Sequence, residues 1–233
     1  MRFSVKIVPL TCSLKLAREE QIVFIFNGSV SRIMCTPENL EELAIGFLIS
    51  EGVAKDGIKV YAEGDVVVAE YDGEPVSFKM HSSGCAGIYT DDSDLPAVKS
   101  CEKWSMEEIE GMLHLLETAE YRTTRGYHSA FVIGKKGVIA RGIDVGRHNA
   151  VDKAIGAAYL KNTDFSRTYL LLSGRISKGI ALKCVRAGIP LVASKAAILD
   201  SAVEVCKRSG LSAVSFASGV AVAGEALSSI HQT

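Results

Sequence analysis

Three short segments hold side chains that can bind phosphate, and two of them also hold a glycine that lets the backbone approach a ligand closely. Asp144-Val145-Gly146-Arg147-His148-Asn149 places a carboxylate, a guanidinium, an imidazole and an amide within six residues. Ser173-Gly174-Arg175-Ile176-Ser177 and the pair Ser194-Lys195 bring similar groups together. Arginine offers a phosphate two parallel donors, and glycine has no side chain in the way. These residue types favour a phosphorylated, nucleotide-like ligand.

Each of these segments follows a predicted strand and precedes a predicted helix. In open α/β sheets, ligands bind in the crevice beyond the carboxyl ends of the strands, where helix amino termini present unpaired N–H groups. Helix capping alone would explain Asp144, Asn149 or Ser173 taken singly. His128, near the start of another predicted strand, is by itself better explained as a structural histidine. Three successive junctions with the same chemistry favour one shared pocket.

One cysteine stands apart from the others. The six cysteines contain no Cys-x-x-Cys pair, which excludes zinc ribbons and thioredoxin-like sites. Cys184 and Cys206 fall in helical patterns, where cysteine behaves as a small hydrophobic residue. Cys85 lies between small residues and glycines in a predicted loop over Ser82 to Lys99, where backbone amides can stabilise a thiolate. The sequence therefore predicts that Cys85 is the reactive thiol.

The elements expected in the first half are mainly strands. An Asn27-Gly28 turn predicts a hairpin, and Thr36 with Pro37 predicts the start of a helix that ends near Gly52. The expected strands are Phe3 to Val8, Ile22 to Phe26, Val30 to Cys35, Ile58 to Tyr61, Asp65 to Tyr71 and Val76 to His81, with the last two joined across Asp72-Gly73.

The second half alternates strands with helices. Ser105 and Glu108 form a capping box before a helix that reaches about Ala119. The strands that follow are Tyr127 to Ile133, Val138 to Gly142, Thr168 to Leu172, Pro190 to Ala193 and Ala213 to Phe216, and the helices are Asn149 to Leu160, Lys178 to Ala187 and Ala197 to Ser209. The fold class expected is α/β (α+β overall), with a strand-rich subdomain over 1–122 and a three-layer α/β/α subdomain with a largely parallel sheet over 123–233.

Net charge and the length of the apolar runs exclude further classes of protein. The 233 residues hold 26 basic and 27 acidic side chains, a formal charge of −1, so general attraction to nucleic acids or membrane surfaces has no support. The longest apolar runs, such as Val66 to Ala69, are far shorter than a membrane span. The amino terminus has no signal-peptide pattern. A cytoplasmic location is expected.

The motifs together resemble the formate dehydrogenase accessory sulfurtransferase (FdhD) family. DVGRHNAVDKAIG is the most specific of them, because so long a run of mixed polar character is unlikely to recur by chance. The matching segments, in the order of the family, are Gly46 to Val53, Thr124 to Phe131, Asp144 to Gly156, Leu171 to Ser177, Lys183 to Ala197 and Ser215 to Gly219.

The resemblance implies a function, a fold and partners. Members are taken to receive sulfur from a cysteine desulfurase as a persulfide and to pass it to a molybdenum or tungsten bis-guanine-dinucleotide cofactor before that cofactor enters formate dehydrogenase. Their fold resembles the cytidine deaminase layer, usually in a homodimer. By this resemblance Cys85 would carry the persulfide, and the pocket would take the guanine nucleotide, with GDP as a mimic and no permanent metal. The residues implied in cofactor binding are His128, Asp144, Gly146, Arg147, His148, Asn149, Asp152, Lys153, Ser173, Gly174, Arg175, Ser194, Lys195, Phe216, Ala217, Ser218, Gly219, Val220 and Ala221.

The chain departs from the family pattern in ways that leave two functions open. The cysteine loop keeps one cysteine where the family typically has two, and Ser218 stands where an arginine is expected. Ile143 replaces a glutamate, and Ala197-Ile198-Leu199 replaces Ala-Pro-Thr. One hypothesis is a sulfurtransferase-like enzyme that uses Cys85. The other is a non-catalytic chaperone that binds the cofactor. A zinc deaminase is disfavoured because His-x-Glu and Pro-Cys-x-x-Cys are both absent.

Overall fold

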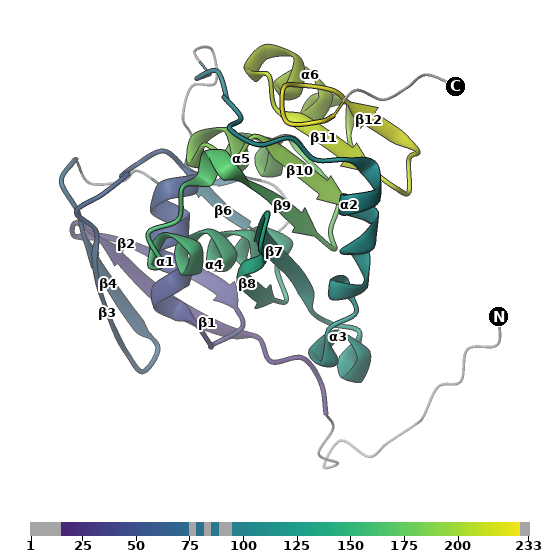
Figure 1. Ribbon diagram of the computed structural model, residues 1–233. Helices are drawn as coiled ribbons and strands as arrows, with labels where there is room; N and C mark the ends of the chain where they lie inside the picture. The colour runs from purple at the N-terminus through teal and green to yellow at the C-terminus, as the bar shows by residue number, and fades with distance from the viewer. Residues whose placement is uncertain (1–14, 75–77, 82–84, 89–94, 229–233) are drawn as a thin grey trace.

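Two sheets and the helices between them form the body of the molecule (Figure 1). The computed structural model describes residues 15–74, 78–81, 85–88 and 95–228, and the strand predicted over Phe3 to Val8 lies outside them. The protein is of mixed α/β class, as expected. Its likeness to the cytidine deaminase layer and the subdomain boundary at residue 122 stay predictions.

The first sheet has the strand order β2-β1-β4-β3. β1 (Glu20–Phe26) and β2 (Ser29–Cys35) form the predicted antiparallel hairpin, and both Asn27 and Gly28 have the positive φ that such a two-residue turn requires. β4 (Val66–Glu70) runs parallel to β1, and β3 (Lys59–Glu63) is antiparallel to β4. The hairpin signal in the sequence was therefore sufficient to place the first two strands.

Helix α1 (Leu40–Ser50) is shared between two hydrophobic cores. Leu43 and Phe47 pack with the first sheet, whereas Ile45 and Ile49 pack with the core of the second. The helix begins after Asn39, so the prediction that Thr36 caps it was wrong. Thr36 is held instead by the second half, because its Oγ accepts the Val145 N–H at 3.1 Å and its own N–H donates to Asp144 at 3.0 Å.

The backbones of helices α1 and α4 (Arg147–Tyr159) are in van der Waals contact where the helices cross, and each helix has a glycine at that point. A Cβ on Gly46 would lie 1.7 Å from the carbonyl oxygen of Asp152, and one on Gly156 would lie 2.0 Å from that of Glu42. Real Cβ atoms do not approach backbone so closely, so both positions require glycine. Gly46 of GFLISEGV and Gly156 of DVGRHNAVDKAIG are therefore packing residues.

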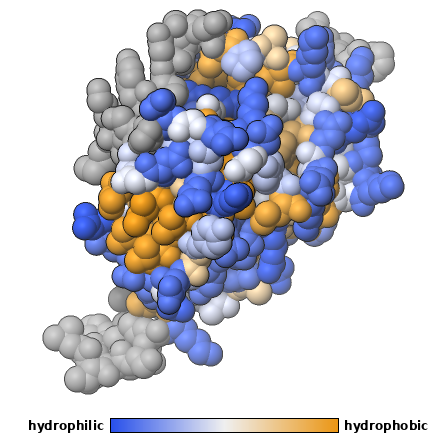
Figure 2. All heavy atoms as spheres, turned by 90° about the vertical axis from the view of Figure 1, so that its left-hand side faces the viewer, coloured by the Kyte–Doolittle hydropathy of each residue, from blue (hydrophilic) through white to orange (hydrophobic). Residues whose placement is uncertain are grey.

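The outer face of the first sheet is apolar and open to solvent in the described part of the chain. Figure 2 looks onto the side of the molecule where this sheet lies and shows an apolar patch there. Val30 and Tyr61 are 56% and 61% exposed, and the half-buried Ile25 and Val68 lie between them in register. The alternation of the strands thus places apolar side chains on both faces of this sheet.

The second sheet has the order β12-β11-β10-β9-β7-β8. Its strands are β7 (His128–Gly134), β8 (Gly137–Asp144), β9 (Thr168–Leu172), β10 (Leu191–Ser194), β11 (Ser212–Ser215) and β12 (Val220–Val222). Only β9, β10 and β11 are mutually parallel neighbours, so the expectation of a largely parallel sheet was wrong. The reason is local: two residues connect β7 to β8, and a connection that short can only join antiparallel strands.

Helices and a preceding segment cover the two faces of this sheet. α4, α5 (Lys178–Ala187) and α6 (Asp200–Ser209) pack on one face. Trp104, α2 (Met106–Gly111) and the 3-10 helix η1 (Leu113–Leu116) pack on the other. The capping box at Ser105 and Glu108 is confirmed, but the single helix predicted there is divided into α2, η1 and α3 (Ala119–Thr124).

A short hairpin replaces part of the long loop predicted over Ser82 to Lys99. β5 (Phe78–His81) pairs antiparallel with β6 (Cys85–Ile88), and His81 is the register partner of Cys85. The loop prediction was wrong for β6, and so was the pairing of β5 with β4. This pairing gives the backbone groups of both segments hydrogen-bond partners. The side chains of this hairpin lie outside the described residues.

Candidate functional site

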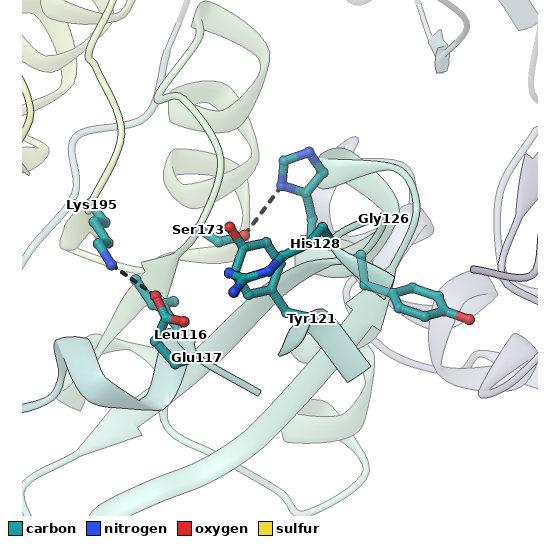
Figure 3. Close-up of a pocket in the computed structure, with 9 residues that line it drawn as sticks. Leu116, Glu117, Tyr121, Gly126, His128, Ser173 and Lys195 are labelled. Atoms are coloured by element: carbon teal, nitrogen blue, oxygen red, sulfur yellow. Dashed lines mark hydrogen bonds and ion pairs between the residues drawn. The ribbon is translucent and has the colours of Figure 1, made fainter. Parts of the chain in front are cut away.

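A pocket of about 250 Å³ lies at the edge of the second sheet where β9 and β10 end and β7 begins (Figure 3). This is the edge that the sequence predicted, because β8, β9 and β10 all end there. A wall from η1 and α3 closes the other side. The lining residues are Leu116, Glu117, Tyr121, Arg125, Gly126, Tyr127, His128, Ser173 and Lys195.

His128 and Ser173 form a hydrogen-bonded pair in this pocket. The Ser173 Oγ accepts the Ser129 N–H at 3.0 Å, so its own proton is free to be donated to Nδ1 of His128, 3.2 Å away. Burial and the charge of Arg147 both lower the pKa of His128. A neutral ring that accepts at Nδ1 carries its proton on Nε2. When the Ser173 hydroxyl is the donor in this bond, His128 offers the pocket an N–H at Nε2.

Gly174 brings Arg147 close to the same place. A Cβ on Gly174 would lie 2.9 Å from the Cβ of Arg147 and 3.4 Å from Nδ1 of His128. The Nε of Arg147 is buried and has no hydrogen-bond partner among the described residues. Since buried N–H groups are nearly always paired in folded proteins, Arg147 has a donor left over for an anion at this edge.

Lys195 and Glu117 form an ion pair at one end of the pocket. The Nζ of Lys195 lies 2.9 Å from Oε1 of Glu117, and Figure 3 shows the contact. This hydrogen bond lowers the pKa of Glu117, so the carboxylate is charged at neutral pH. Beside the pair, the guanidinium carbon of Arg125 lies 4.9 Å from the centre of the Tyr121 ring, within cation–π distance.

His148 lies between helices rather than in the pocket wall. Its Nε2 is 3.2 Å from the position that a Cβ on Gly179 of α5 would take. Burial, with the charges of Lys183 and Arg147, lowers the pKa of His148 to about 3. The imidazole is therefore neutral across the physiological range.

Three other residues of the DVGRHNAVDK motif join the two halves of the molecule. Asp144 and Lys153 form a fully buried ion pair at 2.7 Å. The Lys153 ammonium also donates to the Thr36 carbonyl at 2.8 Å. Asn149 donates from Nδ2 to the Met34 carbonyl and to Asp144, at 3.1 Å and 3.0 Å. These polar atoms face the end of β2 rather than the pocket.

A second buried charge cluster lies where α1, α4 and α5 meet. Lys183 contacts Glu51 at 2.6 Å and Asp152 at 2.9 Å, and it hydrogen-bonds the hydroxyl of Ser50 at 2.9 Å. Arg186 adds a contact of 3.2 Å to Glu51. These carboxylates raise the pKa of Lys183 despite its burial. Asp152, implied in cofactor binding, is thus used inside the protein.

The remaining predicted residues do not line the pocket. Ser194 is buried and donates to the Gly174 carbonyl at 2.6 Å, whereas Arg175 is exposed. Gly146 precedes α4 and donates its N–H to Asp144. Phe216, Ala217, Ser218 and Gly219 form the turn between β11 and β12, and Val220 and Ala221 belong to β12. The Ile198 N–H donates to Ser218 Oγ at 3.3 Å, so this turn lies beside the segment that follows β10.

Sequence reasoning missed most of the pocket wall. Leu116, Glu117 and Tyr121 come from a segment that was assigned to the first half of the chain. Arg125 and Tyr127 belong to TRGYHSAF, the one motif that could have pointed to this wall. Arg125 ends α3 with a positive φ of 57°, a conformation that is uncommon for residues other than glycine.

The cysteines differ in accessibility. Cys35, Cys184 and Cys206 are buried, and burial raises the pKa of each, to about 12 for Cys35 and about 11 for Cys206. Cys101 is exposed. Cys85 begins β6, but its side chain lies outside the described residues. Within the described ranges there is no group of three or more His, Cys, Asp or Glu side chains that could hold a metal ion, and no helix is long and apolar enough to cross a membrane.

Comparison with known proteins gives consistent matches over most of the chain. The FdhD/NarQ family model matches residues 17–223. Sulfur carrier protein FdhD of Burkholderia mallei is 30% identical over 236 residues, covering 87% of this chain and 85% of that protein. Sulfur carrier protein FdhD of Bacillus subtilis is 28% identical over 221 residues, covering 87% and 84%. A crystal structure of a proposed formate dehydrogenase accessory protein from Desulfotalea psychrophila has the same fold, with a TM-score of 0.69, 24% identity and coverage of 86% and 84%.

Proposed function

Because the chain belongs to the FdhD/NarQ family, we propose that it is a sulfur carrier and an accessory protein of formate dehydrogenase. Cys85 accepts sulfur from a cysteine desulfurase as a persulfide. The acceptor is a molybdenum or tungsten cofactor that carries guanine dinucleotides. The formate dehydrogenase catalytic subunit then receives the sulfurated cofactor.

The donor cluster at the pocket is the observation that carries the cofactor part of this proposal. The unpaired Nε of Arg147, the Nε2–H of His128 and the backbone at Gly174 lie together at the carboxyl edge of the sheet. Charge-assisted donors from arginine are well matched to phosphate oxygens. They would hold the pyrophosphate of a guanine nucleotide.

Sulfur loading at Cys85 needs no external oxidant. The Cys85 thiolate attacks the outer sulfur of the desulfurase persulfide, the S–S bond of the donor breaks, and the desulfurase cysteine leaves as a thiolate. In delivery the outer sulfur leaves Cys85, the reduced metal centre of the acceptor supplies two electrons to it, and Cys85 returns to a thiolate. One cysteine is sufficient for both steps.

Loading is tested by mixing the protein with a cysteine desulfurase and cysteine and measuring the intact mass. The wild-type protein should gain one sulfur atom that a thiol reductant removes, and Cys85→Ala should gain none. Cys101→Ala is the matched control because Cys101 is an exposed thiol, and it should load as the wild-type protein does. Loading of Cys85→Ala would refute the role of Cys85.

The lone cysteine of the Ser82 to Gly87 segment supports a second candidate, a chaperone that binds the cofactor without transferring sulfur. Measuring GDP binding and persulfide formation on the same protein distinguishes the two functions. If GDP binds in calorimetry while no persulfide forms on Cys85, the chaperone function replaces the sulfur carrier. If the persulfide forms and is passed on to the acceptor, the chaperone candidate is excluded.

A further inference from the structure

The two ends of the pocket differ in chemistry, as Figure 3 shows. At one end lie His128 and Ser173, next to Gly174 and Arg147, and this end offers hydrogen-bond donors. At the other end lies the Lys195–Glu117 ion pair, and the ring of Tyr121 lies between the two ends. A nucleotide has two comparably different ends, a polyanionic phosphate group and a flat base.

The negative charge of Glu117 determines which part of a nucleotide can lie beside it. Glu117 is the only carboxylate among the residues that line the pocket within the described chain. A charged carboxylate repels phosphate, so the phosphate groups belong at the Arg147 end and the base belongs beside Glu117. The ring of Tyr121, with the Arg125 guanidinium over one face, lies between the two ends and is the kind of flat aromatic surface on which bases stack.

The ion pair also places a donor directly beside an acceptor. Lys195 can donate from Nζ and Glu117 can accept at its carboxylate, with 2.9 Å between the two groups. The Watson–Crick edge of guanine shows the complementary order, with the O6 acceptor beside the N1–H and N2–H donors. Adenine shows a donor at N6 beside an acceptor at N1, which would oppose both partners.

We propose that the Lys195–Glu117 pair is the specificity determinant that selects a guanine base, with Lys195 on O6 and Glu117 on N1–H and the 2-amino group. This inference rests on the proposed function, which places a guanine nucleotide in the pocket. It assigns Lys195 to the base, whereas the sequence had assigned it to phosphate.

Calorimetric titration with GDP, IDP and ADP tests the assignment. IDP differs from GDP only by the missing 2-amino group, so it reports directly on Glu117. The wild-type protein should bind GDP about tenfold to a hundredfold more tightly than IDP or ADP. Glu117→Gln keeps the size of the side chain but presents an amide, and it should lose most of the preference for GDP over IDP. Glu120→Gln is the matched control, since Glu120 lies on α3 outside the pocket lining and should keep that preference.

Three results would overturn the assignment. Glu117→Gln could retain the wild-type preference for GDP over IDP, which would show that Glu117 does not read the base. It could tighten the binding of all three nucleotides equally, which would show that Glu117 only opposes phosphate. If no nucleotide binds the wild-type protein, the cofactor part of the proposed function fails together with this inference, while sulfur loading on Cys85 is measured independently by intact mass.

Discussion

Lys153 and Lys195 both lie near the carboxyl edge of the second sheet, yet they belong to regions with opposite properties. Lys153 is 1% exposed and pairs with the equally buried Asp144 at the junction between the two halves. Lys195 is 57% exposed and pairs with Glu117 over a pocket. The comparison teaches that most of a polar motif in an α/β protein can serve to join its halves, while a neighbouring pocket is lined by residues from other segments.

Removing the charge of Lys153 should have the largest effect. Lys153→Met leaves Asp144 as a buried carboxylate without its cation, and breaking such a pair costs about 3 to 5 kcal/mol. Urea unfolding should show this loss in the free energy of unfolding. Lys195→Met is the matched control and should stay near the wild-type value, because exposed pairs contribute little. Equal losses for both variants would contradict the distinction between junction and pocket.

The crossing of α1 and α4 should be the next most sensitive feature. Gly156→Ala places a methyl group against the backbone of Glu42 and should cost about 1 to 3 kcal/mol or more. A Cβ on Gly111 at the end of α2 would meet nothing within 4 Å, so Gly111→Ala should be neutral or slightly stabilising in thermal unfolding. A harmless Gly156→Ala would mean that the helices can move apart.

Stability should fall as the pH is lowered because of His148. Its pKa is about 3 in the folded protein and 6.5 as a free side chain, so the unfolded chain binds the proton first between those values. The contribution of His148 to the free energy of unfolding should drop by about 1 to 2 kcal/mol from pH 7 to pH 5.

Replacement of the ring should remove this drop. His148→Gln should flatten the pH profile of urea unfolding over this range. His114→Gln, at an exposed histidine, serves as the control and should keep the wild-type profile. A profile that is unchanged in His148→Gln would assign the titration to another group.

The smallest effect expected concerns the cysteines. Limiting iodoacetamide on the native protein should label Cys101 before Cys35, Cys184 or Cys206, because burial raises the pKa of those three thiols. Peptide mapping measures the order. Cys101→Ser should change stability by less than about 0.5 kcal/mol. Early labelling of Cys184 would show that the core opens readily.

Local patterns predicted the elements well where a local interaction fixes them. The Asn27-Gly28 hairpin and the capping box at Ser105 depend on residues close in sequence, and both are present. The edge where strands and helices meet was also predicted, because it follows from strand order along the chain.

The rest could not be predicted because it depends on contacts between distant segments. Thr36 has the type of a helix cap, but its partners are Asp144 and Val145, more than a hundred residues away. Glu117 and Tyr121 enter the pocket only because their segment packs back onto the second sheet. No hydrophobic pattern within either segment predicts these contacts with distant parts of the chain.

The sharing of α1 between two cores has a consequence for the order of synthesis. The ribosome completes residues 20–70 well before it reaches α4 and α5, yet Ile45 and Glu51 have their partners there. During that interval one side of α1 has no neighbour, and the Glu51 carboxylate has no lysine to pair with. The packing of α1 is therefore incomplete until about residue 186 has been synthesised.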